Sequence, residues 1–150
     1  MAILTEQHAK ELLTKVLSYS KADECECNLD GSLSGNIRYA RNTVTTAGES
    51  ADVVLSVQST FGKRTGTATI NEFDNASLKK VVRRAEELAR LVPENPEHMP
   101  VWGPQKYLKA GNYAKSTADV APVDRAKAAD ASITPSKKNK LIASGFLADE

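Results

Sequence analysis

Hydrophobic and polar residues alternate along residues 35–70, and this alternation is the strongest structural pattern in the chain. Successive side chains of a strand leave opposite faces of a sheet, so a period of two predicts strands with one buried face. Within residues 53–61, the expected inward face carries Val53, Leu55, Val57, Ser59 and Phe61. The pair Gly62-Lys63 then predicts a two-residue hairpin loop of type II′, because that loop needs positive φ at its first position.

The residues before this hairpin predict two more strands. Residues 23–30 alternate in the same way and predict the first strand. Residues 31–35 are rich in glycine and serine, which predicts a turn into a second strand over 34–46. Residues 47–50 predict a further turn for a similar reason. Together with the hairpin, these segments are expected to form a meander with one face to be covered.

Two helices are predicted, one before the meander and one after it. Apolar residues recur every three or four positions over residues 6–19, and Thr5 is the expected N-cap. The second helix opens at Asp74 or Asn75 and stops at Pro93. Its apolar stripe consists of Leu78, Val81, Val82, Ala85, Leu88, Ala89 and Val92. Because such a stripe needs a surface to cover, we expect this helix to pack on the meander.

The connection from Pro93 to Pro122 is expected to lack regular structure, because prolines and glycines recur along it. A helix is predicted over residues 122–138, and Pro135 should kink or end it. The apolar positions of this helix are Val123, Ala126, Ala129 and Ile133. A final strand is predicted over residues 141–150.

The expected fold class is therefore α+β, with an antiparallel or mixed sheet covered by helices in the order α-β-β-β-β-α-loop-α-β. We divide the chain into an amino-terminal domain over 1–92, the connection over 93–121, and a helix and strand over 122–150. The last strand ends without a turn, a cap or a polar tail. It is expected to belong to a continuation outside this chain.

Charge and composition narrow the classes of function. The 150 residues carry a formal net charge of +1 at pH 7, far from the basic excess of a nucleic-acid-binding domain. The basic cluster within residues 79–84 could contact phosphate, but a solvated helix face is the simpler interpretation. Neither a membrane-spanning apolar run nor a signal peptide is found in the sequence. We expect a cytoplasmic protein without nucleic-acid or membrane partners.

The residues by themselves identify no catalytic or metal site. His8 and His98 have no second ligand at the helical spacing of a zinc site. Cys25 and Cys27 lie on one face of the first strand with about 6.5–7 Å between their Cα atoms, where parallel Cβ directions disfavour a disulfide. They could be half of a metal site, but two small side chains that face the core are the simpler interpretation.

Four segments, taken in their order along the chain, carry a resemblance to a known family. They are Arg38-Tyr39-Ala40-Arg41-Asn42, Gly62-Lys63-Arg64-Thr65-Gly66-Thr67-Ala68, the helix from Leu78 to Pro93, and Ala143-Ser144-Gly145-Phe146. In order and spacing they resemble the amino-terminal domain of the TldD/PmbA family, also called modulators of DNA gyrase. The resemblance extends over nearly all 150 residues.

The resemblance implies a metallopeptidase or its partner subunit. In the TldD branch, the zinc ligands belong to an HExxxH helix and a more distant cysteine, in a carboxy-terminal half that this chain does not contain. Zinc is therefore expected there, and no catalytic or metal-binding residue is assigned within this chain. The PmbA-like branch lacks the zinc helix and implies a noncatalytic partner. The expected partners are a peptide or unfolded protein substrate and a second subunit, in a homodimer or a TldD/PmbA-like heterodimer.

For this segment, the resemblance implies recognition of substrate and subunit. An extended peptide can pair with sheet edges, and basic or amide side chains can hold acidic side chains or a carboxyl terminus. The substrate-contact candidates are Arg38, Arg41, Asn42, Lys63 and Arg64. The alternative is a solvated sheet face with ordinary hairpin charges.

Trp102 and Tyr107 are the candidates for contact with a partner. Aromatic side chains in a long connection need a surface to cover them, which is either the domain itself or another subunit or domain. A different function also remains open. The chain would then be a noncatalytic interaction module that binds a protein such as a topoisomerase, as the family's older name suggests.

Overall fold

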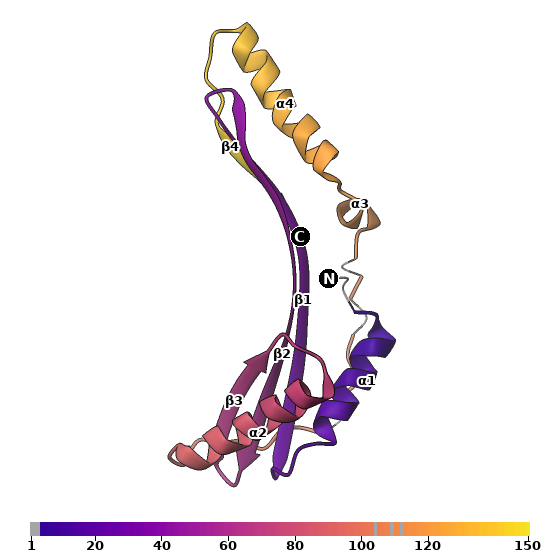
Figure 1. Ribbon diagram of the computed structural model, residues 1–150, viewed down its shortest axis with the longest axis vertical. Helices are drawn as coiled ribbons and strands as arrows, with labels where there is room; N and C mark the ends of the chain where they lie inside the picture. Colours follow the sequence, from indigo (N-terminus) through magenta and orange to yellow (C-terminus); the bar gives the residue numbers. More distant parts are fainter. Residues whose placement is uncertain (1–3, 104, 109, 112) are drawn as a thin grey trace. The chain divides into compact units, whose positions relative to one another are not determined.

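The computed structural model describes residues 4–103, 105–108, 110, 111 and 113–150 (Figure 1). Four strands form one sheet in the order β3-β2-β1-β4, in which β4 pairs antiparallel with β1 and β3 pairs antiparallel with β2. The predicted α+β fold class is confirmed. The elements are α1 (Glu6–Leu17), β1 (Glu24–Ala40), β2 (Thr43–Phe61), β3 (Arg64–Ile70), α2 (Asn75–Leu91), α3 (Lys115–Ala118), α4 (Pro122–Lys138) and β4 (Gly145–Asp149).

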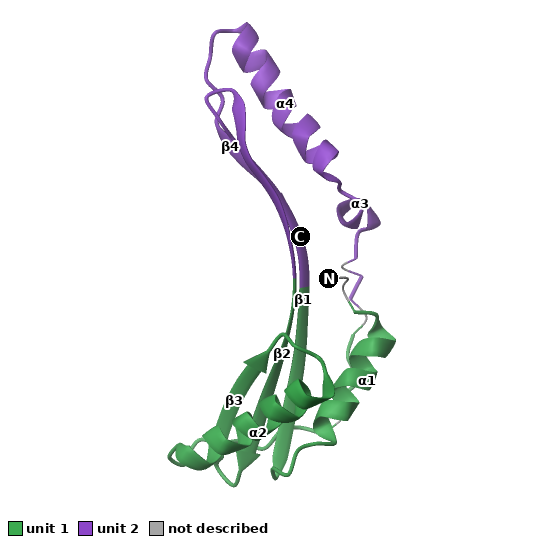
Figure 2. Cartoon of the chain, in the orientation of Figure 1, with its two compact units in different colours: residues 1–31, 52–108 green, residues 32–51, 109–150 purple. Residues whose placement is uncertain are grey.

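The chain divides into two compact units (Figure 2). Unit 1 comprises residues 1–31 and 52–108, and unit 2 comprises residues 32–51 and 109–150. Each unit therefore draws on both β1 and β2, because the boundaries fall inside these two strands. The linear division of the chain after residues 92 and 121 stays a prediction.

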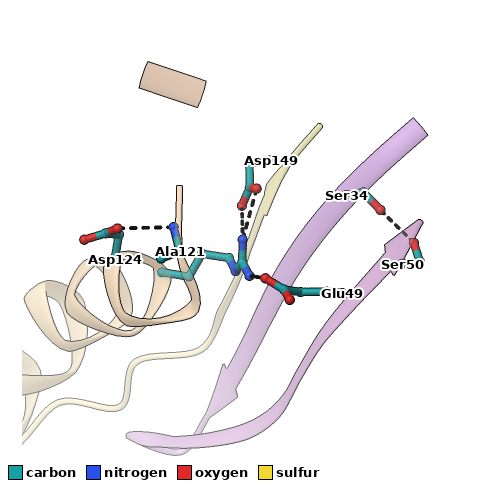
Figure 3. A network of polar contacts seen from close by, with 7 residues as sticks. Ser34, Glu49, Ser50, Ala121, Asp124 and Asp149 are labelled. Carbon is teal, nitrogen blue, oxygen red and sulfur yellow. Dashed lines mark hydrogen bonds and ion pairs between the residues drawn. The ribbon is translucent and has the colours of Figure 1, made fainter. Parts of the chain in front are cut away.

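The two turns predicted at residues 31–35 and 47–50 are wrong. β1 runs through the first segment and β2 runs through the second without interruption. The hydroxyls of Ser34 and Ser50, one from each segment, form a hydrogen bond of 2.9 Å between the two strands (Figure 3). Three strands therefore precede α2, rather than the four that the sequence predicted.

The chain reverses instead at Arg41 and Asn42, whose φ angles are 50° and 63°. Positive φ at both loop positions is typical of a type I′ hairpin, and asparagine tolerates this conformation better than most residues. Gly35, at the end of the first predicted turn, is explained by packing and not by a turn. A Cβ atom at Gly35 would overlap the guanidinium of Arg125, so this strand position has to be glycine for the arginine to lie there.

In unit 1, α1 and α2 cover one face of β2 and β3. The predicted inward face of β2 is confirmed, because Val53, Leu55, Val57 and Ser59 are buried and Phe61 is half-buried. Cys25 and Cys27 are free thiols that pack, half-buried, against this core, as the simpler interpretation predicted. The buried core consists of Val16, Leu55, Val57, Leu78, Val81, Val82 and Ala85.

Gly66 allows α2 to lie directly on β3. A Cβ atom at Gly66 would overlap backbone atoms of Ala85 and Ala89 in α2. The helix and the strand are therefore closer than two side-chain layers would permit. The predicted loop before β3 is confirmed as well, since Gly62 has a φ of 59° between β2 and β3.

In unit 2, α4 and β4 pack on the hairpin end of β1. Register pairs run from Gly35 with Asp149 to Tyr39 with Gly145. The buried core consists of Ile37, Tyr39, Ala129 and Ile133. Two of the four apolar positions predicted for α4 are thus correct. Val123 is 56% exposed and Ala126 is exposed, because the helix turns Arg125 inward with Ala129 and Ile133, at a spacing of four residues.

Smaller differences concern the last third of the chain. α4 continues past Pro135 to Lys138, whereas the predicted final strand begins only at Gly145. The connection expected to lack regular structure contains the four-residue α3. None of the helices in the described residues has the length and apolar character needed to cross a membrane.

Both predicted N-caps are present, and the second settles where α2 begins. The Thr5 hydroxyl accepts the N–H of His8 at 3.3 Å. The Asp74 carboxylate accepts the N–H groups of Ala76 and Ser77 at 2.8 and 3.1 Å, so Asp74 is the cap and Asn75 is the first helical residue. Hydrogen bonds from Ser77 and Ala76 lower the pKa of the Asp74 carboxyl.

We expect Asp74→Ala to lower the thermal unfolding midpoint at pH 7 by about 2–4 °C, because the cap is lost. A carboxyl whose pKa is lowered on folding stabilises the fold above its unfolded pKa of about 3.9. This stabilisation disappears as the pH falls through the folded pKa, so the difference from the native chain should shrink below about pH 4. Circular dichroism melts from pH 7 to pH 3 measure it. Asp74→Asn, which keeps the acceptor, is the control. A difference that stays constant with pH would contradict the assignment.

We expect Gly66→Ala to lower the free energy of unfolding by about 1–3 kcal/mol, because the methyl group would force α2 away from β3. Urea titration followed by circular dichroism measures the loss. The matched control is Gly103→Ala, since a Cβ atom at Gly103 has no neighbour within 4 Å. Equal stability of the two variants would show that α2 does not depend on this close approach.

Candidate functional site

The five substrate-contact candidates are divided between the two units. Arg38, Arg41 and Asn42 belong to unit 2, at the hairpin end of β1 and β2. Lys63 and Arg64 belong to unit 1, at the loop between β2 and β3. Each group therefore has to be considered in its own unit.

Asn42 holds the segment that leads into β4. Its side-chain carbonyl accepts the N–H of Ala143 at 2.7 Å, and its side-chain amide donates to the C=O of Leu141 at 2.8 Å. Its backbone N–H donates to the C=O of Ala143 at 3.1 Å. These bonds occupy the groups that a substrate would need, so Asn42 has a structural role. Nearby, the Arg38 guanidinium lies 5.5 Å from the centre of the Phe146 ring.

Lys63 and Arg64 contact the start of the connection after α2. The C=O of Lys63 accepts the N–H of Asn95 at 2.9 Å. The Arg64 guanidinium lies 3.4 Å from a carboxylate oxygen of Glu94, in a pair exposed to solvent on both sides. Exposed pairs of this kind contribute little to stability, so the Arg64 charge can be redirected to another acidic group.

Glu24 anchors the connection a few residues further on. Its carboxylate accepts the backbone N–H of Val101 at 2.8 Å and lies 3.1 Å from Nε2 of His98. The Val101 N–H and then the His98 ring lower the pKa of this carboxyl. The chain is thereby held against the first residue of β1 just before a group of exposed apolar side chains.

Trp102 and Tyr107 do not pack back on the chain, since they are 82% and 87% exposed. Met99 and Leu108 beside them are exposed to a similar extent. We refer to Met99, Trp102, Tyr107 and Leu108 as the apolar segment. These four large apolar side chains are thus exposed within residues 99–108.

Arg125 is the centre of a charged cluster in unit 2, and Figure 3 labels its two acidic partners, Glu49 and Asp149. Its side chain is 6% exposed, and Nη1 donates to both carboxylate oxygens of Asp149 at 2.9 and 3.0 Å. Nη2 donates to the Glu49 carboxylate. These carboxylates, Asp149 above all, raise the pKa of Arg125. One helical side chain thus joins α4 to β2 and β4.

A cavity of about 260 Å³ lies beside this cluster, which is the volume of about one large side chain. Two carboxylates already balance the Arg125 charge, so the cavity offers no net positive charge to an anion. It suits an uncharged or basic side chain rather than a phosphate. The lining residues are Asn36, Ile37, Ala47, Gly48, Glu49, Pro122 and Arg125.

The two thiols influence each other within β1. This contact lowers the pKa of Cys25 to about 6 and raises the pKa of Cys27. Both side chains pack against the unit 1 core, so we assign them no catalytic role. Among residues 4–103, 105–108, 110, 111 and 113–150, no three His, Cys, Asp or Glu side chains are grouped to hold a metal ion.

Sequence reasoning missed the Arg125 cluster. Its members are distant in sequence, at Glu49, Arg125 and Asp149, and each is an ordinary charged residue in its own element. One local signal was available. Arg125 lies four residues before Ala129 and eight before Ile133, so a charged residue occupies the apolar stripe of α4.

Comparisons with known proteins show which family and which folds the chain resembles. Residues 26–89 match the family model described as PmbA/TldA metallopeptidase domain 1. A search of curated protein sequences found no match to the chain. Among solved structures, TldE from Thermococcus kodakarensis is similar, with a TM-score of 0.77 and 16% identity over 93% of this chain and 32% of that one.

Two further structures share the fold. A protein designated a candidate modulator of DNA gyrase from Thermotoga maritima has a TM-score of 0.72 and 12% identity, over 93% of this chain and 32% of that one. A similarly designated protein from Bacteroides thetaiotaomicron has a TM-score of 0.68 and 16% identity, over 86% and 30%. The chain therefore spans about a third of the length of these neighbours.

The matched residues include most of β1, all of β2 and β3, and most of α2, which together supply most of the unit 1 core. The same stretch holds two of the four segments on which the sequence resemblance rests, and most of a third. The resemblance is confirmed over this stretch: residues 26–89 match the first domain of the PmbA/TldA metallopeptidase family, and the chain has the fold of the three neighbours.

Proposed function

We propose that this chain is the substrate-guiding and dimerisation domain of a zinc-dependent metallopeptidase of the TldD/PmbA type. The observation that carries the proposal is the match of residues 26–89 to a metallopeptidase domain 1. The neighbours with this fold are about three times longer, which leaves room for a separate catalytic part. In this proposal, zinc and the residues that bind it lie in that part, and the protein acts on peptides or unfolded proteins in the cytoplasm.

The apolar segment supports a role in contact with another polypeptide. The Glu24 carboxylate holds the chain at His98 and Val101, while Trp102 and Tyr107 beyond it remain exposed. Because Glu24 already fixes the chain at His98 and Val101, the following residues have less conformational freedom. A partner that orders them therefore has less conformational entropy to remove. Aromatic side chains presented in this way supply most of the binding energy at many interfaces. We assign these two residues to the contact with a second subunit.

The exposed basic residues support a role in substrate guidance. Arg41 lies at the tip of the hairpin, and Arg38 and Arg64 hold only solvent-exposed or aromatic partners. Guanidinium groups in such positions can exchange these partners for acidic side chains or a carboxyl terminus. The side chain of Asn42 is already occupied in the fold. We therefore assign guidance to the arginines and not to Asn42.

A second candidate is a noncatalytic partner subunit or interaction module, for example one that binds a topoisomerase. The names of the structural neighbours favour this second candidate, since one is TldE and two are designated candidate modulators of DNA gyrase. In this case the apolar segment would serve the same contact, but no peptide would be cleaved by the protein itself.

We expect the natural protein that carries this chain to cleave an unfolded substrate such as β-casein only when zinc is bound. Treatment with 1,10-phenanthroline should abolish cleavage, and added Zn²⁺ should restore it, because the metal supplies the activated water. Gel analysis of the products and metal analysis of the protein measure both effects. A protein that contains no zinc and cleaves nothing would instead support the partner-subunit candidate.

We expect Trp102→Ala with Tyr107→Ala to raise the subunit dissociation constant at least about tenfold, because two aromatic anchors are removed. Sedimentation equilibrium of the natural protein measures the change. The control is Ile142→Ala, which removes an apolar side chain that is 75% exposed outside the apolar segment. An unchanged dissociation constant in the double variant would overturn the assignment of this segment to the subunit contact.

A further inference from the structure

β3 presents a free edge on unit 1. It pairs with β2 alone among the described strands, and Figure 1 shows it at the margin of the sheet. In an antiparallel ladder, alternate residues direct their N–H and C=O groups away from the partner strand. β3 therefore offers a row of unpaired backbone groups along Arg64–Ile70.

Most of this edge lacks the usual protection against strand addition. Charged side chains, proline and bulges are devices that natural edge strands use; Arg64 begins β3 with a charge, and residues 65–70 carry none of these devices. The strand instead carries Thr65, Thr67 and Thr69, which favour extended backbone. The six residues 65–70, without such a device, are suited to pairing with another extended chain.

A cleft of about 360 Å³ runs beside this edge, between the end of β3 and α2. Lys80 and Arg84 of α2 contribute its two positive charges, and Glu72 contributes its one negative charge. The Glu72 carboxylate already accepts the Ser77 hydroxyl at 2.9 Å. The remaining lining residues are Ala68, Thr69, Ile70, Asn71 and Val81.

Within the part of the chain that the structure describes, Lys80 and Arg84 form no ion pair, although other basic residues of α2 are occupied. Lys79 lies 5.3 Å from the Tyr19 ring centre, and Arg83 lies 3.5 Å from the Glu87 carboxylate. Lys80 and Arg84 are four positions apart on a helix, so their like charges repel each other. An acidic group bound between them would relieve that repulsion.

We propose that the free edge of β3 binds an extended acidic polypeptide as an added strand, with its carboxylates held by Lys80 and Arg84. Side chains at positions n and n+2 of a strand share a face and are about 6.6–6.8 Å apart. Residues i and i+4 of a helix are separated by a similar rise of about 6 Å. The recognised pattern is therefore an acidic residue, any residue, and a second acidic residue. This surface shares no residue with the apolar segment and needs no peptidase activity.

The probe is a fluorescein-labelled octapeptide with blocked ends that alternates glutamate with valine or threonine. Fluorescence anisotropy with the natural protein should show saturable binding, because backbone pairing and two ion pairs act together. Lys80→Glu with Arg84→Glu should weaken the affinity at least about tenfold, and glutamine in place of glutamate should have a similar effect. Circular dichroism melts check that the exposed substitutions leave the fold intact.

Two controls separate strand addition from general charge attraction. Lys79→Glu with Arg83→Glu makes the same charge change on the same helix outside the cleft, and it should change the affinity less than about threefold. A probe with N-methyl groups at alternate residues keeps its charge but loses strand pairing, so it should bind at least about tenfold more weakly. Hydrogen exchange of the native protein should slow at residues 65–70 when the unmodified probe binds.

Four outcomes would overturn the proposal. They are absence of binding at 1 mM probe, an equal loss in both double variants, full affinity of the N-methylated probe, and unchanged exchange along β3. Tighter binding of a DNA duplex than of the probe, with the same dependence on Lys80 and Arg84, would assign these residues to phosphate instead. Loss of zinc-dependent cleavage leaves these readouts unaffected, so failure of this proposal and failure of the proposed function are distinguishable.

Discussion

Space left by a glycine for a neighbouring backbone or side chain is the constraint on which both units depend. In unit 1, Gly66 brings β3 against the backbone of α2, and the apolar stripe of the helix then covers β2 and β3. In unit 2, Gly35 leaves space for the Arg125 side chain, and Gly145 leaves space for the Tyr39 ring. Each glycine belongs to a strand. Because glycine is freer than other residues in the unfolded chain, it loses more conformational entropy on folding. The burial that each permits offsets this cost.

Arg125 has the character of a positioning residue rather than of a binding group. A buried guanidinium without partners would be strongly destabilising, and two carboxylates from different strands remove that penalty. The ion pairs therefore specify where α4 lies on β1, β2 and β4 more than they add net stability. The cavity beside them is neutral or slightly acidic for the same reason, and it differs in this from the positively charged cleft at β3.

The functional picture is one of recognition surfaces on a family scaffold. The apolar segment, the arginines of the hairpin end and the β3 edge present three different chemistries: apolar, cationic, and backbone pairing combined with cationic groups. Under the proposed function, the apolar segment serves a subunit contact and the arginines serve substrate guidance, so each chemistry is assigned its own partner.

The sequence by itself determined the α+β class, the caps at Thr5 and Asp74, the Gly62 loop and the inward face of β2, because these depend on local periodicity and local hydrogen bonds. It also carried the family resemblance. Only the tertiary structure decided that residues 31–35 and 47–50 are strand, since glycine and serine signal a turn locally. At Gly35, the local sequence also reveals nothing of the Arg125 side chain that needs the space. The Arg125 cluster and the cleft at β3 likewise required the fold, because each joins residues that are far apart in the chain.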